Sequence, residues 1–160
     1  MTQIKYKIIL TLIMLFSIFT LLTAYFIQYV LKHQPCNLCL IERIPYIISI
    51  LVIFTCLFFK KFEKISLIIL SLIFFSAALI AFYHFGIEQG FIKESLVCDL
   101  NIESDILTKE AILSQLKQQT ISCKNVTFRI LGFSLATINI FVSLILSLIT
   151  LRLFLNYEKN

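Results

Sequence analysis

The sequence contains little charge, little glycine and little proline, and each scarcity excludes a class of protein. Charged residues make up 14% of the 160 residues and hydrophobic residues 59%, whereas an ordinary soluble domain has about 25% and 45–50%. The apolar residues fall in long runs rather than along one helical face, which excludes a soluble hydrophobic core and indicates a membrane protein. Three glycines and two prolines leave no room for a flexible linker, so we expect a single domain over residues 1–160.

The basic excess does not indicate a nucleic-acid partner. The formal net charge is +5, but no basic patch is interleaved with aromatic residues. In a membrane protein, such an excess is explained by lysines that retain loops on the cytoplasmic side.

Four apolar runs are long enough to be considered as membrane spans. A bilayer core of about 30 Å needs roughly 20 apolar residues in a helix, and backbone polar groups within it must be satisfied inside the segment. We therefore predict an all-α membrane protein, a four-transmembrane-helix bundle. Its helices are expected at Ile8 to about Leu31, Ile44 to Phe59, Ile65 to about Phe85, and Val126 to about Leu151.

The distribution of lysine and arginine predicts the orientation. With four spans, both termini share one side with the loop 60–64, and these short segments are dense in basic residues. The segments 32–43 and 86–125 are longer, have fewer basic residues per length, and include most of the acidic residues. The positive-inside rule then places the termini in the cytoplasm and both cysteine-bearing loops in the bacterial periplasm, where disulfides persist.

Four of the five cysteines form two pairs on this predicted periplasmic side. Cys36 and Cys39 form a C-x-x-C, a spacing used in thiol exchange. Cys98 and Cys123 are 25 positions apart in a polar loop, so one interpretation is a structural disulfide and another is a relay with the C-x-x-C. A zinc site made by all four cysteines is a further alternative. The periplasmic location and the lack of a second C-x-x-C argue against such a site, so we expect no metal. A c-type haem is excluded because Leu40, not histidine, follows Cys39.

Two further residues are candidates for the site, and the fifth cysteine has a separate interpretation. Arg43 lies four positions after Cys39, where its permanent cation would stabilise a Cys39 thiolate or the oxygen anion of a reduced acceptor; the alternative is an arginine that reaches lipid head groups. His84 lies at the outer end of the third span and is a candidate for contacting a quinone carbonyl. Cys56 lies in the second span, and we interpret it as a packing residue.

Three stretches together resemble one known family. Residues 34–46, QPCNLCLIERIPY, are similar to the P-C-x-L-C-x-x-[QE]-R-x-P-Y signature of DsbB proteins. Residues 83–90 resemble the Y-H-x-G-x-E-x-G segment of many members, and residues 123–136 resemble the C-x-x-[VA]-x-[WF]-R-x-L-G-x-S-x-A segment before the last helix. The stretches occur in the family's order.

The resemblance implies an activity and the roles of the site residues. A reduced periplasmic thioredoxin-like partner of the DsbA type would attack the Cys98–Cys123 disulfide at Cys98, and Cys123 would pass the exchange to Cys36. Cys39 would be released as the thiolate facing a membrane quinone, ubiquinone or menaquinone, with Arg43 stabilising it. The protein would thus be a quinone-dependent thiol/disulfide oxidoreductase of the bacterial inner membrane.

The chain departs from the family at a few positions, and other functions stay open. Position 42 is Glu where many relatives have Gln, and the chain has no tryptophan; both leave the quinone and the partner open. One alternative is a membrane scaffold with structural disulfides, and another is an oxidase for a dedicated partner other than DsbA. An enzyme of the vitamin-K-epoxide-reductase type is disfavoured because its C-x-x-C follows the loop cysteines, whereas here it precedes them.

Overall fold

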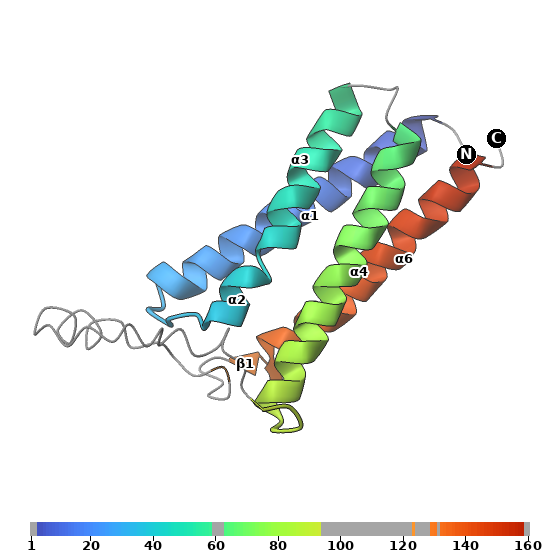
Figure 1. Ribbon diagram of the computed structural model, residues 1–160. Helices are drawn as coiled ribbons and strands as arrows, with labels where there is room; N and C mark the ends of the chain where they lie inside the picture. The colour runs from blue at the N-terminus through green and yellow to red at the C-terminus, as the bar shows by residue number, and fades with distance from the viewer. Residues whose placement is uncertain (1–2, 59–62, 94–122, 124–128, 131, 159–160) are drawn as a thin grey trace, which may run out of the picture.

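The computed structural model describes residues 3–58, 63–93, 123, 129–130 and 132–158. Its elements are α1 (Gln3–Tyr29), α2 (Asn37–Ile41), α3 (Ile44–Phe58), α4 (Glu63–Glu88), β1 (Arg129–Ile130), β2 (Phe133–Ser134) and α6 (Leu135–Glu158). Four long helices run up and down as a bundle, with α2, β1 and β2 at one end (Figure 1). The start of α1 and the end of α6 lie at the opposite end of the bundle. The all-α, four-helix prediction is therefore confirmed.

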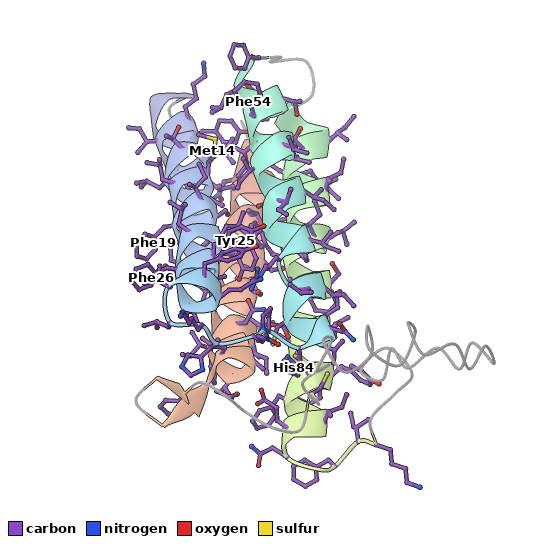
Figure 2. All side chains as sticks on the ribbon, turned by 90° about the vertical axis from the view of Figure 1, so that its left-hand side faces the viewer. Met14, Phe19, Tyr25, Phe26, Phe54 and His84 are labelled. Atoms are coloured by element: carbon purple, nitrogen blue, oxygen red, sulfur yellow. The ribbon has the colours of Figure 1, made fainter. Side chains whose placement is uncertain are left out.

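The outside of the bundle is apolar. Four stretches are long and apolar enough to cross a membrane: Tyr6–Tyr29, Asn37–Phe58, Glu63–Glu88 and Leu135–Asn156. Large apolar side chains on them are exposed, and Figure 2 shows Phe19 and Phe26 pointing away from the helices. An apolar surface of this extent would be unstable in water but matches lipid, so the chain is a multi-pass membrane protein.

The inside of the bundle combines apolar packing with small polar contacts. Phe74, Leu10 and Ile53 are fully buried in the main core. The most extensive helix pair is α4 with α6, where Ser147 Oγ donates to the carbonyl of Ser71 at 3.1 Å. Small hydroxyl residues let neighbouring helices approach closely in a membrane.

Cys56 lies in this core, as the packing interpretation expected. Its side chain is buried, and its Sγ is 3.3 Å from the hydroxyl of Tyr6 on α1. Cys56 therefore links two helices near the end of the bundle opposite the other described cysteines.

A tight turn brings the C-x-x-C back against the bundle. The backbone of Lys32 adopts the left-handed conformation, with φ 56°, and the N–H of His33 donates to the carbonyl of Ile27 at 3.2 Å. Helix α2 begins after Cys36, whose Sγ accepts from the N–H of Cys39 at 3.3 Å. Pro45 then falls in the first turn of α3, where its missing N–H has no intrahelical partner to lose.

The structure corrects the predicted start of the last helix. It was expected from Val126, but Arg129–Ile130 and Phe133–Ser134 pair as an antiparallel hairpin and the helix begins at Leu135. Gly132 has φ +87° in this turn, a conformation that favours glycine. The other helix ends differ from the expected ranges by up to seven residues, with α1 beginning at Gln3 and α6 ending at Glu158.

Candidate functional site

The C-x-x-C lies at the edge of a cavity inside the bundle. The cavity has a volume of about 330 Å³ and lies between α1, the α2–α3 segment and α6. Apolar side chains of α1 and α6 form much of its lining. Five residues predicted from the sequence as site residues line it: Cys36, Cys39, Arg43, His84 and Cys123. The remaining one, Cys98, lies outside the described residues.

The two cysteines of the motif are free thiols with their sulfurs in contact. Cys36 Sγ and Cys39 Sγ are 2.7 Å apart. The N-cap position of Cys36 and the first turn of α2 hold them on the same side of the chain. The pKa of the Cys36 thiol is raised above its ordinary value, first by the hydrogen bond with Cys39 and then by burial, while a hydrogen bond with His84 opposes the shift. Cys36 therefore retains its proton when the pair is reduced.

Cys123 comes to the same place from a distant part of the sequence. It is 2% exposed and packs in one buried cluster with Cys36, Leu38 and Ile87. The structure thus brings one loop cysteine next to the motif.

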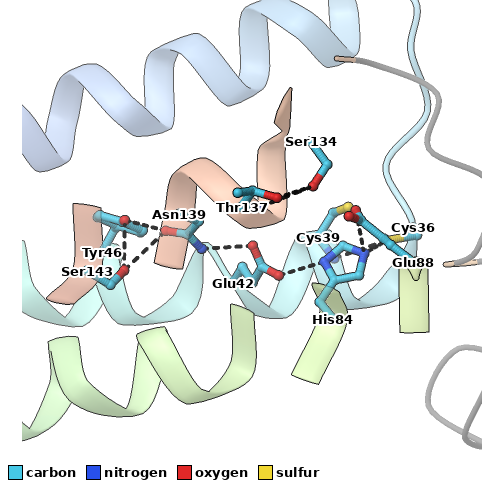
Figure 3. Close-up of polar contacts among 10 residues, drawn as sticks. All are labelled: Cys36, Cys39, Glu42, Tyr46, His84, Glu88, Ser134, Thr137, Asn139 and Ser143. Atoms are coloured by element: carbon cyan, nitrogen blue, oxygen red, sulfur yellow. Dashed lines mark hydrogen bonds and ion pairs between the residues drawn. The ribbon is translucent and has the colours of Figure 1, made fainter. Parts of the chain in front are cut away.

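His84 connects the sulfurs to a buried polar chain. Its Nε2 is 3.5 Å from Cys36 Sγ and its Nδ1 is 2.6 Å from Glu42 Oε1 (Figure 3). The other oxygen of Glu42, Oε2, accepts from Asn139 Nδ2 at 2.8 Å. Tyr46 donates its hydroxyl to Asn139 Oδ1 at 2.5 Å. The ring of His84 is consequently fixed in orientation, with Nε2 directed at the cysteine pair.

Glu88 adds a second carboxylate on the other side of His84. It lies one turn after His84 on α4, with Oε1 3.7 Å from His84 Nε2. Its side chain is only 5% exposed, and Oε2 has no hydrogen-bond partner among the described residues.

Arg43 lines the cavity but contacts α1. Its Nη1 donates to Gln28 Oε1 at 2.7 Å, and its guanidinium carbon lies 5.0 Å from the centre of the Tyr25 ring. These contacts position the cation within the bundle. The stabilisation of a Cys39 thiolate or of an acceptor's oxygen anion by Arg43 stays a prediction.

Sequence reasoning missed the polar chain behind His84. Glu42 was noted only as a departure from a family pattern, and Tyr46 only as the end of the stretch 34–46. Tyr46 is nevertheless 6% exposed and hydrogen-bonded. Asn139 gave one available signal, because it is an amide within an apolar span. Polar residues inside membrane helices usually face the bundle interior and mark a functional site.

Comparison with known proteins identifies the family. A family model described as disulfide bond formation protein DsbB matches residues 6–153. A protein of Rickettsia prowazekii (strain Madrid E), described as uncharacterized, is 30% identical over 158 residues, which cover 98% of this chain and 91% of the relative. No solved structure matches significantly.

Proposed function

The chain belongs to the family of disulfide bond formation protein DsbB, and from that premise we propose that it is a protein-disulfide oxidase. It reoxidises a periplasmic DsbA-type thiol oxidoreductase and passes the electrons to a membrane quinone. The observation that supports this most is the C-x-x-C at the edge of a cavity that Arg43, His84 and Cys123 also line.

The thiol steps use both cysteine pairs. A thiolate of the reduced partner attacks Cys98 of a Cys98–Cys123 disulfide, and the partner's second thiol then resolves the mixed disulfide, so that the partner is oxidised. The thiolate of Cys123 next attacks Cys36 of a Cys36–Cys39 disulfide, which forms a Cys36–Cys123 bond and releases Cys39 with the electron pair of the broken bond. The burial of Cys123 against Cys36 supports this order, since attack requires the two sulfurs to meet.

His84 and its neighbours act as positioning residues for this exchange. The 2.6 Å contact with Glu42 requires a hydrogen between the two atoms and fixes the imidazole ring. His84 Nε2 is then held near Cys36, where it can accept or return a proton as the sulfur alternates between thiol and disulfide.

The cavity fits an amphipathic quinone. Its volume of about 330 Å³ lies within the usual range for small-molecule sites. Arg43 and His84 supply polar groups, and Leu21, Ile27 and Val142 supply apolar wall. When bound, a quinone would accept two electrons and two protons. Arg43 would hold a carbonyl oxygen as the fixed cation, and Cys39 would face it.

The family and the distribution of charge support a location. We place the protein in the bacterial inner membrane as one integral domain, with cytoplasmic termini and with α2 and the hairpin on the periplasmic side. The basic residues near the ends of α1 and α6 support this orientation.

Quinone reduction by the purified protein tests the proposal. The protein in detergent receives a reduced DsbA-type protein and a soluble quinone analogue, and quinone reduction is followed by absorbance. We expect turnover by the parent, none by Cys39→Ser, and slowing of at least about 10-fold by Arg43→Ala, because one fixed charge–oxyanion contact contributes roughly that much or more. Arg152→Ala, an arginine of α6 near the opposite end of the bundle, is the matched control and should turn over as the parent does.

A folded parent that reduces no quinone while its disulfides stay formed would contradict the proposal and favour a scaffold with structural disulfides. Turnover with one thioredoxin-like protein but not with a general DsbA would instead indicate a dedicated partner.

A further inference from the structure

Three donor atoms of the site lie close enough together to hold one metal ion. Cys36 Sγ, Cys39 Sγ and a ring nitrogen of His84 all lie within 4.8 Å of one another. In a tetrahedral zinc site with Zn–S bonds of about 2.3 Å, two sulfurs are about 3.8 Å apart. The sulfurs are 2.7 Å apart. Moving them apart by roughly 1 Å more, which rotation of the side chains can achieve, would make room for the ion.

Glu88 supplies a candidate fourth donor, and its Oε1 lies 3.7 Å from His84 Nε2. Its side chain is only 5% exposed, and its Oε2 has no hydrogen-bond partner among the described residues. The residue lines the same cavity as both cysteines and His84, and Figure 3 shows the four side chains converging. An unpartnered carboxylate oxygen in an apolar bundle is costly, and a bound cation would remove that cost.

The surroundings of His84 are those of a metal-ligating histidine. Such residues donate the ring N–H that is not used for the metal to a carboxylate, which fixes the tautomer and raises the basicity of the ligating nitrogen. Here Nδ1 contacts Glu42 at 2.6 Å, and Asn139 holds the far oxygen of Glu42 at 2.8 Å. Nε2 is thereby left facing the sulfurs.

We propose that the reduced site binds one Zn²⁺ through Cys36, Cys39, His84 and Glu88. Both thiols lose their protons to solvent as two Zn–S bonds form, and no electron is transferred. The two thiolates balance the charge of the ion, and the Glu88 carboxylate adds one further negative charge. A disulfide offers no thiolate, so the oxidised site does not bind.

Zinc binding would also regulate the enzyme. An ion on both sulfurs blocks the exchange with Cys123 and the formation of the Cys36–Cys39 disulfide, so zinc would inhibit turnover by trapping the reduced form. This consequence rests on the proposed function, whereas the binding itself does not. The site differs from the four-cysteine zinc site considered from the sequence, because it excludes Cys98 and Cys123.

The test is a zinc titration of reduced and oxidised protein in detergent. A Cys98→Ala/Cys123→Ala background removes the loop thiols, Zn²⁺ is titrated against a chromophoric chelator, and Co²⁺ reports sulfur ligation by its charge-transfer bands. We expect one equivalent in the reduced protein and none in the oxidised protein. His84→Ala and Glu88→Gln should each weaken binding by at least about 10-fold, and Glu42→Gln by about 10- to 100-fold.

Cys56→Ser is the matched control and should bind as the background does, since Cys56 lies in the core near the other end of the bundle. Thermal unfolding of every variant checks that it is folded. If a variant does not fold, a second measurement on the unsubstituted reduced protein takes its place. In this measurement, protection of Cys39 by zinc against alkylation is followed by mass spectrometry.

Equal binding by oxidised protein, full binding by His84→Ala, loss of the site in the double-alanine background, or no zinc protection of Cys39 would overturn the proposal. Zinc binding by a protein that never reduces quinone would leave this inference intact and reject the proposed function. Quinone reduction that zinc does not slow, together with no zinc binding, would reject this inference and leave the proposed function intact.

Discussion

Replacing Asn139 tests whether the buried polar chain holds the site together. Asn139→Leu keeps the side-chain size but removes the amide that donates to Glu42 at 2.8 Å and accepts from Tyr46 at 2.5 Å. Ser143 also donates to this amide oxygen, at 3.2 Å. The change therefore leaves one oxygen of a buried carboxylate without its donor.

The expected loss follows from these contacts. A hydrogen bond to a carboxylate contributes about 1.5–3 kcal/mol, and an interhelical hydrogen bond between neutral groups in a membrane about 0.6 kcal/mol. Tyr46 and Ser143 already lie 3.3 Å apart, so they can satisfy one another after the change. We expect the free energy of unfolding to fall by about 2–4 kcal/mol in total.

The assay is unfolding in mixed micelles by titration with a denaturing detergent, with quinone reduction measured beside it. Tyr46→Phe is the graded comparison, because it removes only the neutral contacts with Asn139 and Ser143 and leaves Glu42 satisfied. It should cost about 0.5–1.5 kcal/mol. Turnover should slow more in Asn139→Leu, since Glu42 then holds His84 less firmly. A loss below about 0.5 kcal/mol in Asn139→Leu, or equal losses in the two variants, would refute the reasoning.

Three further changes test other parts of the structure. Glu42→Gln should retain the fold but slow quinone reduction, because the amide holds His84 without a charge; an unchanged rate would show that the charge is not used. The raised pKa of Cys36 means that this thiol contributes its full stabilisation of the reduced protein below the ordinary thiol pKa of about 8.5, and that this contribution declines as the pH rises further; thermal unfolding against pH should show the decline, and Cys36→Ser should flatten it. Gly86→Ala should destabilise by about 1–3 kcal/mol, because a Cβ there would lie 2.6 Å from Ile92 Cδ1; Ile92→Ala should restore the midpoint of unfolding, and failure to do so would assign the loss to the backbone.

The helices could be predicted because a bilayer imposes their length. A run such as Ile65 to Phe85 can cross apolar lipid only as a helix, so hydropathy alone sufficed to predict α4. The hairpin before α6 could not be predicted in this way. Residues 126–134 are as apolar as many helical segments. The break depends on the left-handed backbone of Gly132, and a single glycine in a sequence does not reveal its backbone conformation.

The candidate site was predicted from its cysteines and only partly from its polar residues. C-x-x-C spacing is a local signal, so Cys36 and Cys39 were evident. The packing of Cys123 in one buried cluster with Cys36 depends on tertiary structure, and so does the hydrogen bond that joins Glu42 on the α2–α3 segment to Asn139 on α6. No spacing in the sequence reports such contacts.

Glu42 shows why the polar chain must act as a unit. A carboxylate in an apolar bundle is strongly unfavourable unless each oxygen has a partner, and here Oε1 contacts His84 while Oε2 contacts Asn139. Removing His84 therefore does more than remove an imidazole from the cysteine pair, because it leaves Glu42 half satisfied. The destabilisation by His84→Ala should shrink when Glu42 is also replaced by an apolar residue of similar size, and a double-mutant cycle that finds the two losses simply additive would contradict this coupling.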